Sequence, residues 1–362
     1  MASQHDIARI LGMSQTAVSF ALRGKPWVSK KTIKRVRAAA TKIGYRPDPM
    51  ISALMAQRRA SRPSAFKAKI AFVTGYPRRD EWRLSSYAAG CYAGVKSGVM
   101  ARGYSCEVFW LWEPGISNER LGQILWSQNV QGLIFAPLPV DIPPIRLDWS
   151  RFALASLDYS LGDPQVHRIV DDHGYGMERV LGEIDKLGYR RPGLVLRASQ
   201  DVRTHHSRLG SFLVGRRLHP DWSDVAPLIL PEDRWDVDLF AHWLRRKKPD
   251  VILTEEVEMV PAVTKLGFRV PRDVGIAFFH QNKPTEQLSG LLVNSMKVGL
   301  RAAQVLMNLI ETNERGAPAI PTTTLVEAFT WHDGTTLRKS SPATTRSENP
   351  RRQLIAEARG FV

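Results

Sequence analysis

The chain has 362 residues, which is too long for one small hydrophobic core and predicts two or three domains. Its formal net charge of +16 is concentrated at the ends. Residues 1–69 hold 15 Lys and Arg against 2 Asp and Glu, residues 338–362 hold 6 against 2, and residues 70–337 hold 30 against 31. This partition predicts a phosphate-binding surface near the N-terminus and argues against one on the large middle segment.

The cysteine content and the hydropathy pattern exclude several classes of protein. Cys91 and Cys106 stand alone, without the spacing of a metal or redox motif, which is typical of a reducing compartment. The N-terminus lacks the apolar segment of a secretory signal, and the sequence has no apolar run of membrane-spanning length. We therefore expect a cytoplasmic protein with no metal, no cofactor and no membrane contact.

Residues 6–23 predict two short amphipathic helices joined by a turn at Gly12, with Ser14 capping the second helix. The apolar arc of the second helix contains Ala17, Val18, Ala21 and Leu22. Its outward arc contains Gln15, Thr16, Ser19, Phe20 and Arg23. Amide, hydroxyl and guanidinium groups near a helix start are suited to base edges in the major groove of DNA. A small helical hairpin without such a role is the alternative, and the basic surroundings favour DNA.

The segment that follows predicts a third helix and a short conditional one. Residues 30–43 repeat apolar side chains at helical spacing and end at Gly44, a favourable C-cap. Asp48 and Pro49 can begin another helix, but the run to Gln57 is only about two turns, and an isolated helix of that length is unstable in water. We expect it to form only against a partner, with residues 58–68 as a linker.

These segments resemble the LacI family of bacterial transcription repressors. The resemblance lies in Asp-Ile-Ala-Arg-Ile-Leu-Gly-Met-Ser-Gln-Thr-Ala-Val-Ser at 6–19, Val-Ser-Lys-Lys-Thr at 28–32 and Ile-Gly-Tyr-Arg-Pro-Asp-Pro at 43–49. It implies a homodimer that reads a pseudo-palindromic operator, and a hinge helix whose leucine, here Leu54 beside Ala53, wedges into the minor groove. Base contacts are expected from Gln15, Thr16, Ser19 and Phe20. Phosphate contacts are expected from Ser14, Arg23, Lys25, Lys30, Tyr45 and Arg46.

Two residues depart from the family's usual pattern. Phe20 follows the Val-Ser of the second helix where the family commonly has arginine, and Ser52 stands two residues before Leu54 where arginine is again usual. A phenylalanine cannot donate to guanine, although it can touch a thymine methyl group. The operator sequence therefore cannot be borrowed from relatives.

From residue 69 onward, strand and helix patterns alternate, which predicts parallel α/β sheets. Expected strands include 70–73, 106–111, 130–135, 152–157, 192–197, 251–253, 275–279 and 324–329. The pattern restarts midway and resembles the family's effector domain of two Rossmann-like subdomains, similar to periplasmic sugar-binding proteins. We expect an all-α three-helix headpiece at 1–48, a hinge helix and linker at 49–68, and an effector and dimerisation domain at 69–337. Its N-subdomain would hold about 69–168 and 294–323, its C-subdomain about 169–293 and 324–337, and residues 338–362 would form a disordered basic tail.

In such a fold a ligand binds between the two halves, at the carboxyl ends of the strands. Arg208, in Arg-Leu-Gly-Ser-Phe, matches the family's effector-binding arginine. The other expected contacts are Glu255 or Glu256, His280 where the family commonly has aspartate, Asp172, Tyr87 and Trp82. Each has a plainer interpretation: a surface arginine, a buried histidine, a helix cap at Asp172, and aromatic packing at Tyr87 and Trp82.

The resemblance implies a homodimeric repressor controlled by a small effector such as a sugar, with inducer and corepressor behaviour both open. An enzyme is disfavoured, because the sequence has no P-loop, GxGxxG, GxSxG or HExxH motif. A sugar-binding protein without DNA regulation would not need the basic headpiece. An architectural DNA-binding protein would not need so large an α/β domain.

Overall fold

The computed structural model describes residues 4–22, 28–45, 68–139, 142–231, 235–282, 285 and 287–339. Several predictions lie outside these residues: the phosphate contacts of Arg23, Lys25 and Arg46, the hinge with Ala53 and Leu54, and most of the tail. Within the described residues, no helix is both long and apolar enough to cross a bilayer.

The headpiece consists of three helices, as the sequence predicts. They are α1 (Gln4–Leu11), α2 (Gln15–Leu22) and α3 (Lys30–Lys42). Gly12 adopts a φ of +63° at the turn, and the Ser29 hydroxyl caps α3 by accepting from the Thr32 amide at 3.1 Å. A small core holds the helices together and contains Ile7, Ala8, Val18, Ala21, Val36 and Ala40.

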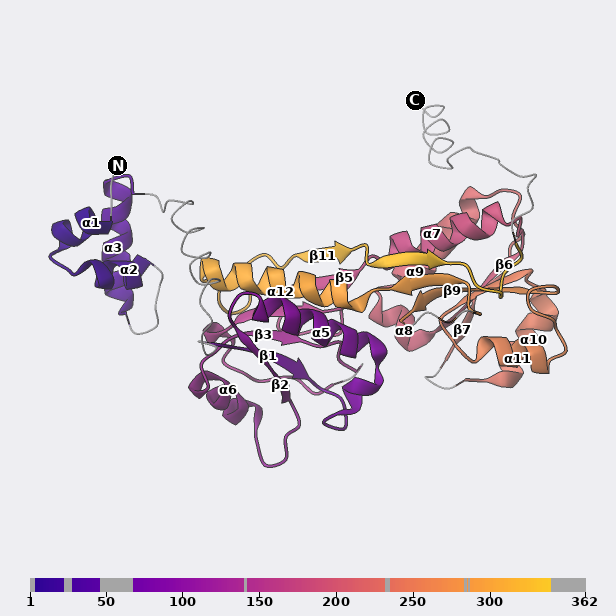
Figure 1. Cartoon of the computed structure of the whole chain (residues 1–362), viewed down its shortest axis with the longest axis horizontal. Coiled ribbons are helices and arrows are strands. Elements are labelled where there is room, and N and C mark those ends of the chain that lie inside the picture. The colour runs from indigo at the N-terminus through magenta and orange to yellow at the C-terminus, as the bar shows by residue number, and fades with distance from the viewer. Residues whose placement is uncertain are drawn as a thin grey trace, which may run out of the picture.

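The first subdomain of the large domain is a six-stranded, all-parallel sheet with helices on both faces (Figure 1). Its strand order is β11-β5-β4-β3-β1-β2. The strands are β1 (Lys69–Thr74), β2 (Ser105–Trp110), β3 (Val130–Phe135), β4 (Ala153–Leu157), β5 (His167–Asp171) and β11 (Thr323–Val326). The helices are η1 (Glu81–Leu84), α5 (Ser86–Met100), α6 (Asn118–Ser127), η2 (Trp149–Arg151) and α12 (Ser295–Thr312).

Successive side chains of β1 point to opposite faces of this sheet, and helices cover both faces. Ile70 and Phe72 pack into the core beneath α5 and α12, whereas Ala71 and Val73 pack into a second core with α6. Both sets are fully buried, so the strand reads as a continuous apolar run.

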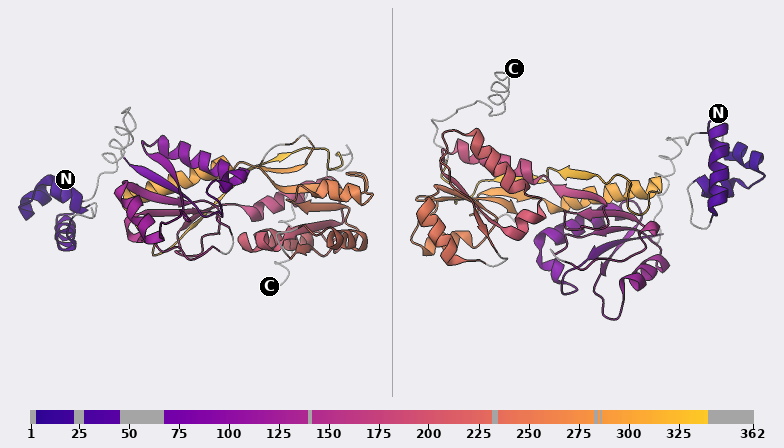
Figure 2. Two further views of the ribbon diagram at one scale, coloured as in Figure 1. Left: turned by 90° about the horizontal axis from the view of Figure 1, so that it is seen from below. Right: turned by 180° about the vertical axis from the view of Figure 1, so that it is seen from behind.

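The second subdomain repeats the design with the strand order β12-β10-β9-β8-β6-β7, in which only β10 and β12 pair antiparallel. Figure 2 shows it beside the first subdomain from two sides. Its strands are β6 (Pro192–Arg197), β7 (Leu228–Leu230), β8 (Val251–Thr254), β9 (Gly275–Gln281), β10 (Gly290–Val293) and β12 (Phe329–His332). Its helices are α7 (His173–Lys186), α8 (Ala198–Arg203), α9 (Ser207–Leu218), α10 (Val237–Lys247) and α11 (Met259–Lys265).

The chain passes between the two sheets three times, and the predicted boundaries need correction there. The boundaries at 168 and 323 fall within β5 and at the start of β11, which both belong to the first sheet. The crossings lie instead between β5 and α7, between β10 and α12, and between β11 and β12. The single strand predicted at 324–329 is two strands in different sheets, because the segment between β11 and β12 is the third crossing.

A close helix–helix contact joins α5 to α12 on one face of the first sheet (Figures 1 and 2). A Cβ atom added at Gly94 would lie 2.1 Å from the Met296 carbonyl oxygen, and one added at Gly299 would lie 2.0 Å from the Cys91 carbonyl oxygen. Glycine on both helices therefore lets the two backbones touch.

The last described residues correct the predicted start of the tail. Arg338 lies over the Tyr189 ring, 3.9 Å from its centroid, and its backbone amide donates to the Tyr189 hydroxyl at 3.0 Å. Residues 338 and 339 are thus part of the described fold, and residues 340–362 lie outside it.

Candidate functional site

The start of α2 presents polar side chains to solvent. Gln15 and Thr16 are exposed, and the Ser14 hydroxyl caps the helix by accepting from the Ala17 amide at 3.2 Å. Lys30, the first residue of α3, is also exposed. This geometry suits a recognition helix, whose first residues meet base edges while flanking groups hold phosphates. The individual DNA contacts remain predictions.

Three other predicted DNA contacts, Ser19, Phe20 and Tyr45, differ from one another in exposure or in their contacts. The prediction that Ser19 faces outward is wrong, because its exposed fraction is 9%. It lies about 100° from Val18 around the helix, at the border of the buried arc. Phe20 is partly exposed. The Tyr45 hydroxyl accepts from the Gln4 side-chain amide at 3.1 Å, a role that leaves its own hydrogen able to be donated to a phosphate oxygen.

Arg208, in the first turn of α9 in the large domain, is the centre of the second site. Its side chain is 6% exposed, and its Nη1 donates to Glu255 Oε2 at 2.7 Å. The guanidinium also lies over the Phe279 ring, 5.0 Å from the centroid. Arg208 is therefore not a surface arginine, and it lies against Glu255 and His280, two other candidate effector residues. Their contact with an effector stays a prediction.

His280, near the end of β9, contacts both subdomains. Its Nδ1 lies 3.0 Å from Arg208 Nη2 and its Nε2 lies 3.3 Å from Asn282 Oδ1. The ring also meets Tyr87 of α5 edge to face, with centroids 5.4 Å apart. Since Tyr87 belongs to the first subdomain, this contact crosses between the two halves, at the carboxyl ends of the strands.

The structure distinguishes the two adjacent glutamates. Glu255 faces Arg208, as described above. Glu256 is buried away from it and accepts from Arg197 Nε at 2.6 Å, while its own amide donates to the Thr254 hydroxyl at 3.0 Å. Glu255 is therefore the member of the pair that belongs to the site.

Asp171, which the sequence did not single out, is the last residue of β5 and is 4% exposed. Neither carboxylate oxygen has a hydrogen-bond partner among the described residues. The Tyr87 hydroxyl approaches closely enough to influence the carboxyl without meeting hydrogen-bond geometry. Burial raises the pKa of Asp171 to about 6, and Tyr87 and Arg208 oppose the rise. A buried carboxylate with two unused oxygens is a candidate acceptor for a ligand.

This carboxyl predicts a measurable pH dependence. The folded pKa lies above the unfolded value of about 3.9, so the folded state binds the proton more tightly, and stability falls as pH rises from about 4 to about 6. We expect Asp171→Asn, which cannot ionise, to increase the free energy of unfolding at pH 7 by about 2–3 kcal/mol. Urea unfolding at several pH values measures this difference, which should vanish near pH 4.

The matched control is Asp163→Asn, which removes a carboxyl at an exposed position. It should leave the free energy of unfolding nearly unchanged at pH 7. If the wild-type protein were as stable at pH 7 as the Asp171→Asn variant, ionisation of Asp171 would not lower the free energy of unfolding, and the prediction would be wrong.

Two of the predicted effector residues have structural roles. Trp82 is 1% exposed and packs against Phe72 and Tyr92, with ring centroids at 5.6 and 5.1 Å, so the prediction that it contacts an effector is wrong. The Trp82 indole packs into the hydrophobic core of the first subdomain. Asp172 caps α7 by accepting from the Tyr175 amide at 3.0 Å, although it also borders the cavity described below.

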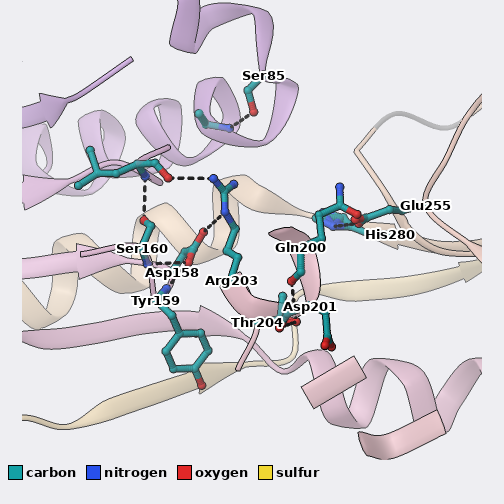
Figure 3. Close-up of polar contacts among 12 residues, drawn as sticks. Ser85, Asp158, Tyr159, Ser160, Gln200, Asp201, Arg203, Thr204, Glu255 and His280 are labelled. Carbon is teal, nitrogen blue, oxygen red and sulfur yellow. Dashed lines mark hydrogen bonds and ion pairs between the residues drawn. The ribbon is translucent and has the colours of Figure 1, made fainter. Parts of the chain in front are cut away.

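A second set of contacts, which no sequence pattern indicated, joins the two subdomains (Figure 3). Arg203 of α8 donates to the Leu138 carbonyl oxygen at 2.9 Å, and its Nε lies 3.9 Å from Asp158 Oδ2. Nearby, Tyr159 stacks on His205 with centroids 4.1 Å apart. Burial raises the pKa of Asp158 to about 6, against the opposing charge of Arg203. These contacts hold the two halves in their present arrangement.

Little space remains between these side chains. The cavity beside Arg208 has a volume of about 10 Å³, which is about the least that one water molecule needs. A ligand of sugar size therefore requires the two halves to separate. The lining residues are Asp171, Asp172, His173, Gly176, Arg208, Phe279, His280, Leu291, Val293 and Phe329. A hollow of about 450 Å³ at Asp238, Ala241, His242, Arg245 and Arg246 is open and lined by α10 alone.

His173 and Asp171 could have been found from sequence only with β5 in place. The run Val-Asp-Asp-His ends that strand and begins α7, which brings consecutive side chains to the cavity. Burial, followed by the charges of Arg208 and His280, lowers the pKa of His173 well below its usual value, so this imidazole is neutral.

Comparison with known proteins gives a consistent result. Residues 4–48 match the family model of bacterial regulatory proteins, lacI family. The HTH-type transcriptional regulator CelR of Thermobifida fusca is 27% identical over 188 residues, which are 51% of this chain and 52% of that protein. The match thus spans about half the length of this relative.

Two solved structures share the fold over nearly the whole chain. A transcriptional regulator CelR–cellobiose complex has a TM-score of 0.58 and 20% identity, covering 93% of this chain and 100% of that one. The lac repressor dimer bound to operator and the anti-inducer ONPF has a TM-score of 0.53 and 19% identity, covering 93% and 99%. The helix-turn-helix segment of this chain therefore matches the lacI family of bacterial regulatory proteins, and the two-subdomain fold that follows it is shared with the two structures.

Proposed function

We propose that this protein is a sequence-specific DNA-binding transcription regulator, a homodimeric repressor controlled by a small effector bound between its two α/β subdomains. The observation that carries the proposal is the presence on one chain of a basic helix-turn-helix and a cleft with converging polar groups. The exposed Gln15 and Thr16 supply the first, and Arg208, Glu255 and His280 supply the second. The relatives are transcription regulators, which favours regulation over catalysis.

The DNA partner is a pseudo-palindromic operator read by two headpieces. A homodimer presents two recognition helices related by two-fold symmetry, so its binding site has matching symmetry. The lac repressor structure described above is a dimer on its operator, which supports this arrangement. Leu54 remains the proposed minor-groove wedge. We place the protein in the bacterial cytoplasm, on the nucleoid.

The effector is a sugar or sugar derivative. A structure that shares the fold is a transcriptional regulator CelR–cellobiose complex, and the cleft of this chain has the carboxylates and aromatic rings that hold sugars. An effector that separates or closes the subdomains shifts the DNA-binding equilibrium only through its different affinity for the two arrangements. Effector and operator affinities must then be coupled equally in both directions.

Base reading is tested by Thr16→Ala and Gln15→Ala. Each should weaken binding to the selected operator by about 1–3 kcal/mol, because a base contact is lost, with little loss on random DNA. Fluorescence anisotropy on both duplexes measures the difference at fixed salt. Lys30→Ala is the control, since a phosphate contact should weaken both duplexes alike. If Thr16→Ala weakens both duplexes equally, α2 does not read bases through this residue.

A further inference from the structure

The charge of Arg208 is already matched within the protein. Arg208 and Glu255 form an ion pair at 2.7 Å, and their side chains are only 6% and 12% exposed. A buried guanidinium without a counter-charge would attract an anionic ligand strongly. Here Glu255 occupies that role before any ligand arrives.

The neighbouring imidazoles add no positive charge. A guanidinium only donates, so His280 Nδ1 accepts from Arg208, and the ring hydrogen lies on Nε2, from which it is donated to Asn282 Oδ1. Burial, and then the charge of Arg208, lowers the pKa of His280 to about 3. His173 is neutral for the same reasons, as described above. No cation near Arg208 is therefore left to balance an acidic ligand among the residues that line the cavity.

The unused hydrogen-bonding groups are acceptors. Both oxygens of Asp171 and Oε1 of Glu255 are buried and have no hydrogen-bond partner in the part of the chain that the structure describes. A ligand rich in hydroxyl groups would donate to them, whereas a carboxylate or phosphate would bring further acceptors beside them. Phe279 and Phe329 line the same cavity and offer apolar faces. Glu255 and His280 come from adjacent strand ends and lie together (Figure 3).

We propose that Glu255 restricts this cleft to uncharged, hydroxyl-rich effectors, because it neutralises Arg208 and leaves only acceptors unfilled. The inference rests on the proposed effector site and deepens it. Acidic sugars and sugar phosphates are excluded by the carboxylates of Glu255 and Asp171. Loss of the Glu255 charge leaves Arg208 without the carboxylate that it contacts and leaves Asp171 as the one carboxylate of the two, so the same cleft then accepts anions that it otherwise rejects.

The test uses the full-length protein and thermal unfolding with paired probes: glucose with glucuronate, cellobiose with cellobionate, and inorganic phosphate alone. In the wild-type protein, any probe that raises the unfolding midpoint should be an uncharged sugar. Glu255→Gln should gain a rise of several degrees with phosphate and the acids. Stabilisation of the wild-type protein by an acidic probe would overturn the proposal, as would a Glu255→Gln variant that gains no response.

Two controls locate the effect. Glu258→Gln removes the same charge from an exposed position nearby and should behave as wild type. Arg208→Gln combined with Glu255→Gln should lose the acquired anion response, and retention of that response would place the anion elsewhere and contradict the proposal. The wild-type comparison stands even if a variant fails to fold. None of these measurements involves DNA. Their outcome therefore does not depend on whether the protein binds DNA, and the two proposals can fail separately.

Discussion

Gly94→Val should destabilise the large domain by more than about 3 kcal/mol. The new side chain would begin 2.1 Å from the Met296 carbonyl oxygen and 2.8 Å from the Leu300 backbone nitrogen. These are backbone atoms of α12, so they cannot move aside as a flexible side chain would. Overpacking at a tight contact forces the helices apart and exposes part of the core beneath α5 and α12. Urea unfolding followed by circular dichroism measures the loss.

Gly182→Ala is the matched control for this prediction. Gly182 lies within α7, and a Cβ atom there would meet nothing within 4 Å. Alanine should stabilise the helix there by about 0.5–1 kcal/mol, because it is the better helix former. If Gly94→Val lowered the free energy of unfolding no more than Gly182→Ala does, the close contact of α5 with α12 would not limit stability.

Arg208→Met should lower the free energy of unfolding by about 3–5 kcal/mol and abolish the effector response. The variant leaves Glu255 buried without its cation, and the removal of one partner from a buried pair is strongly destabilising. It also removes a donor to His280. Urea unfolding measures the stability loss, and operator binding with and without the effector measures the response.

The double variant Arg208→Met with Glu255→Met separates the two consequences. It should recover much of the lost stability, because no uncompensated charge remains, while the effector response stays absent. Arg217→Met, on an exposed position of the same helix, should change neither property. A normal effector response in Arg208→Met would remove this arginine from the binding site.

The elements that could be predicted from sequence are those with a strong local signal. The headpiece helices carry clear caps and turn glycines, and the buried strands β1, β3 and β8 appear as apolar runs. The strands β5, β7 and β10 were not predicted, because β5 is mixed in composition and β7 and β10 have only three and four residues. Without β5, the boundary between the subdomains was placed a few residues early.

Only some residues of the candidate site could be predicted from the sequence. Arg208, Glu255 and His280 were proposed individually, but their convergence depends on the order of β6, β8 and β9 in the sheet. Asp171 and the Arg203–Asp158 contact depend on how the two subdomains meet, which has no local signal. Trp82 was misassigned because an aromatic residue in a loop can equally pack into the core, as it does here.

The central claim is that this chain reads DNA sequence through its headpiece. The most direct measurement is selection of full-length protein against a pool of random duplexes, followed by sequencing of the retained DNA. The account predicts enrichment of one sequence with two-fold symmetry, which Thr16→Ala should enrich poorly. Retention of duplexes with no common sequence, at the same salt concentration, would contradict it.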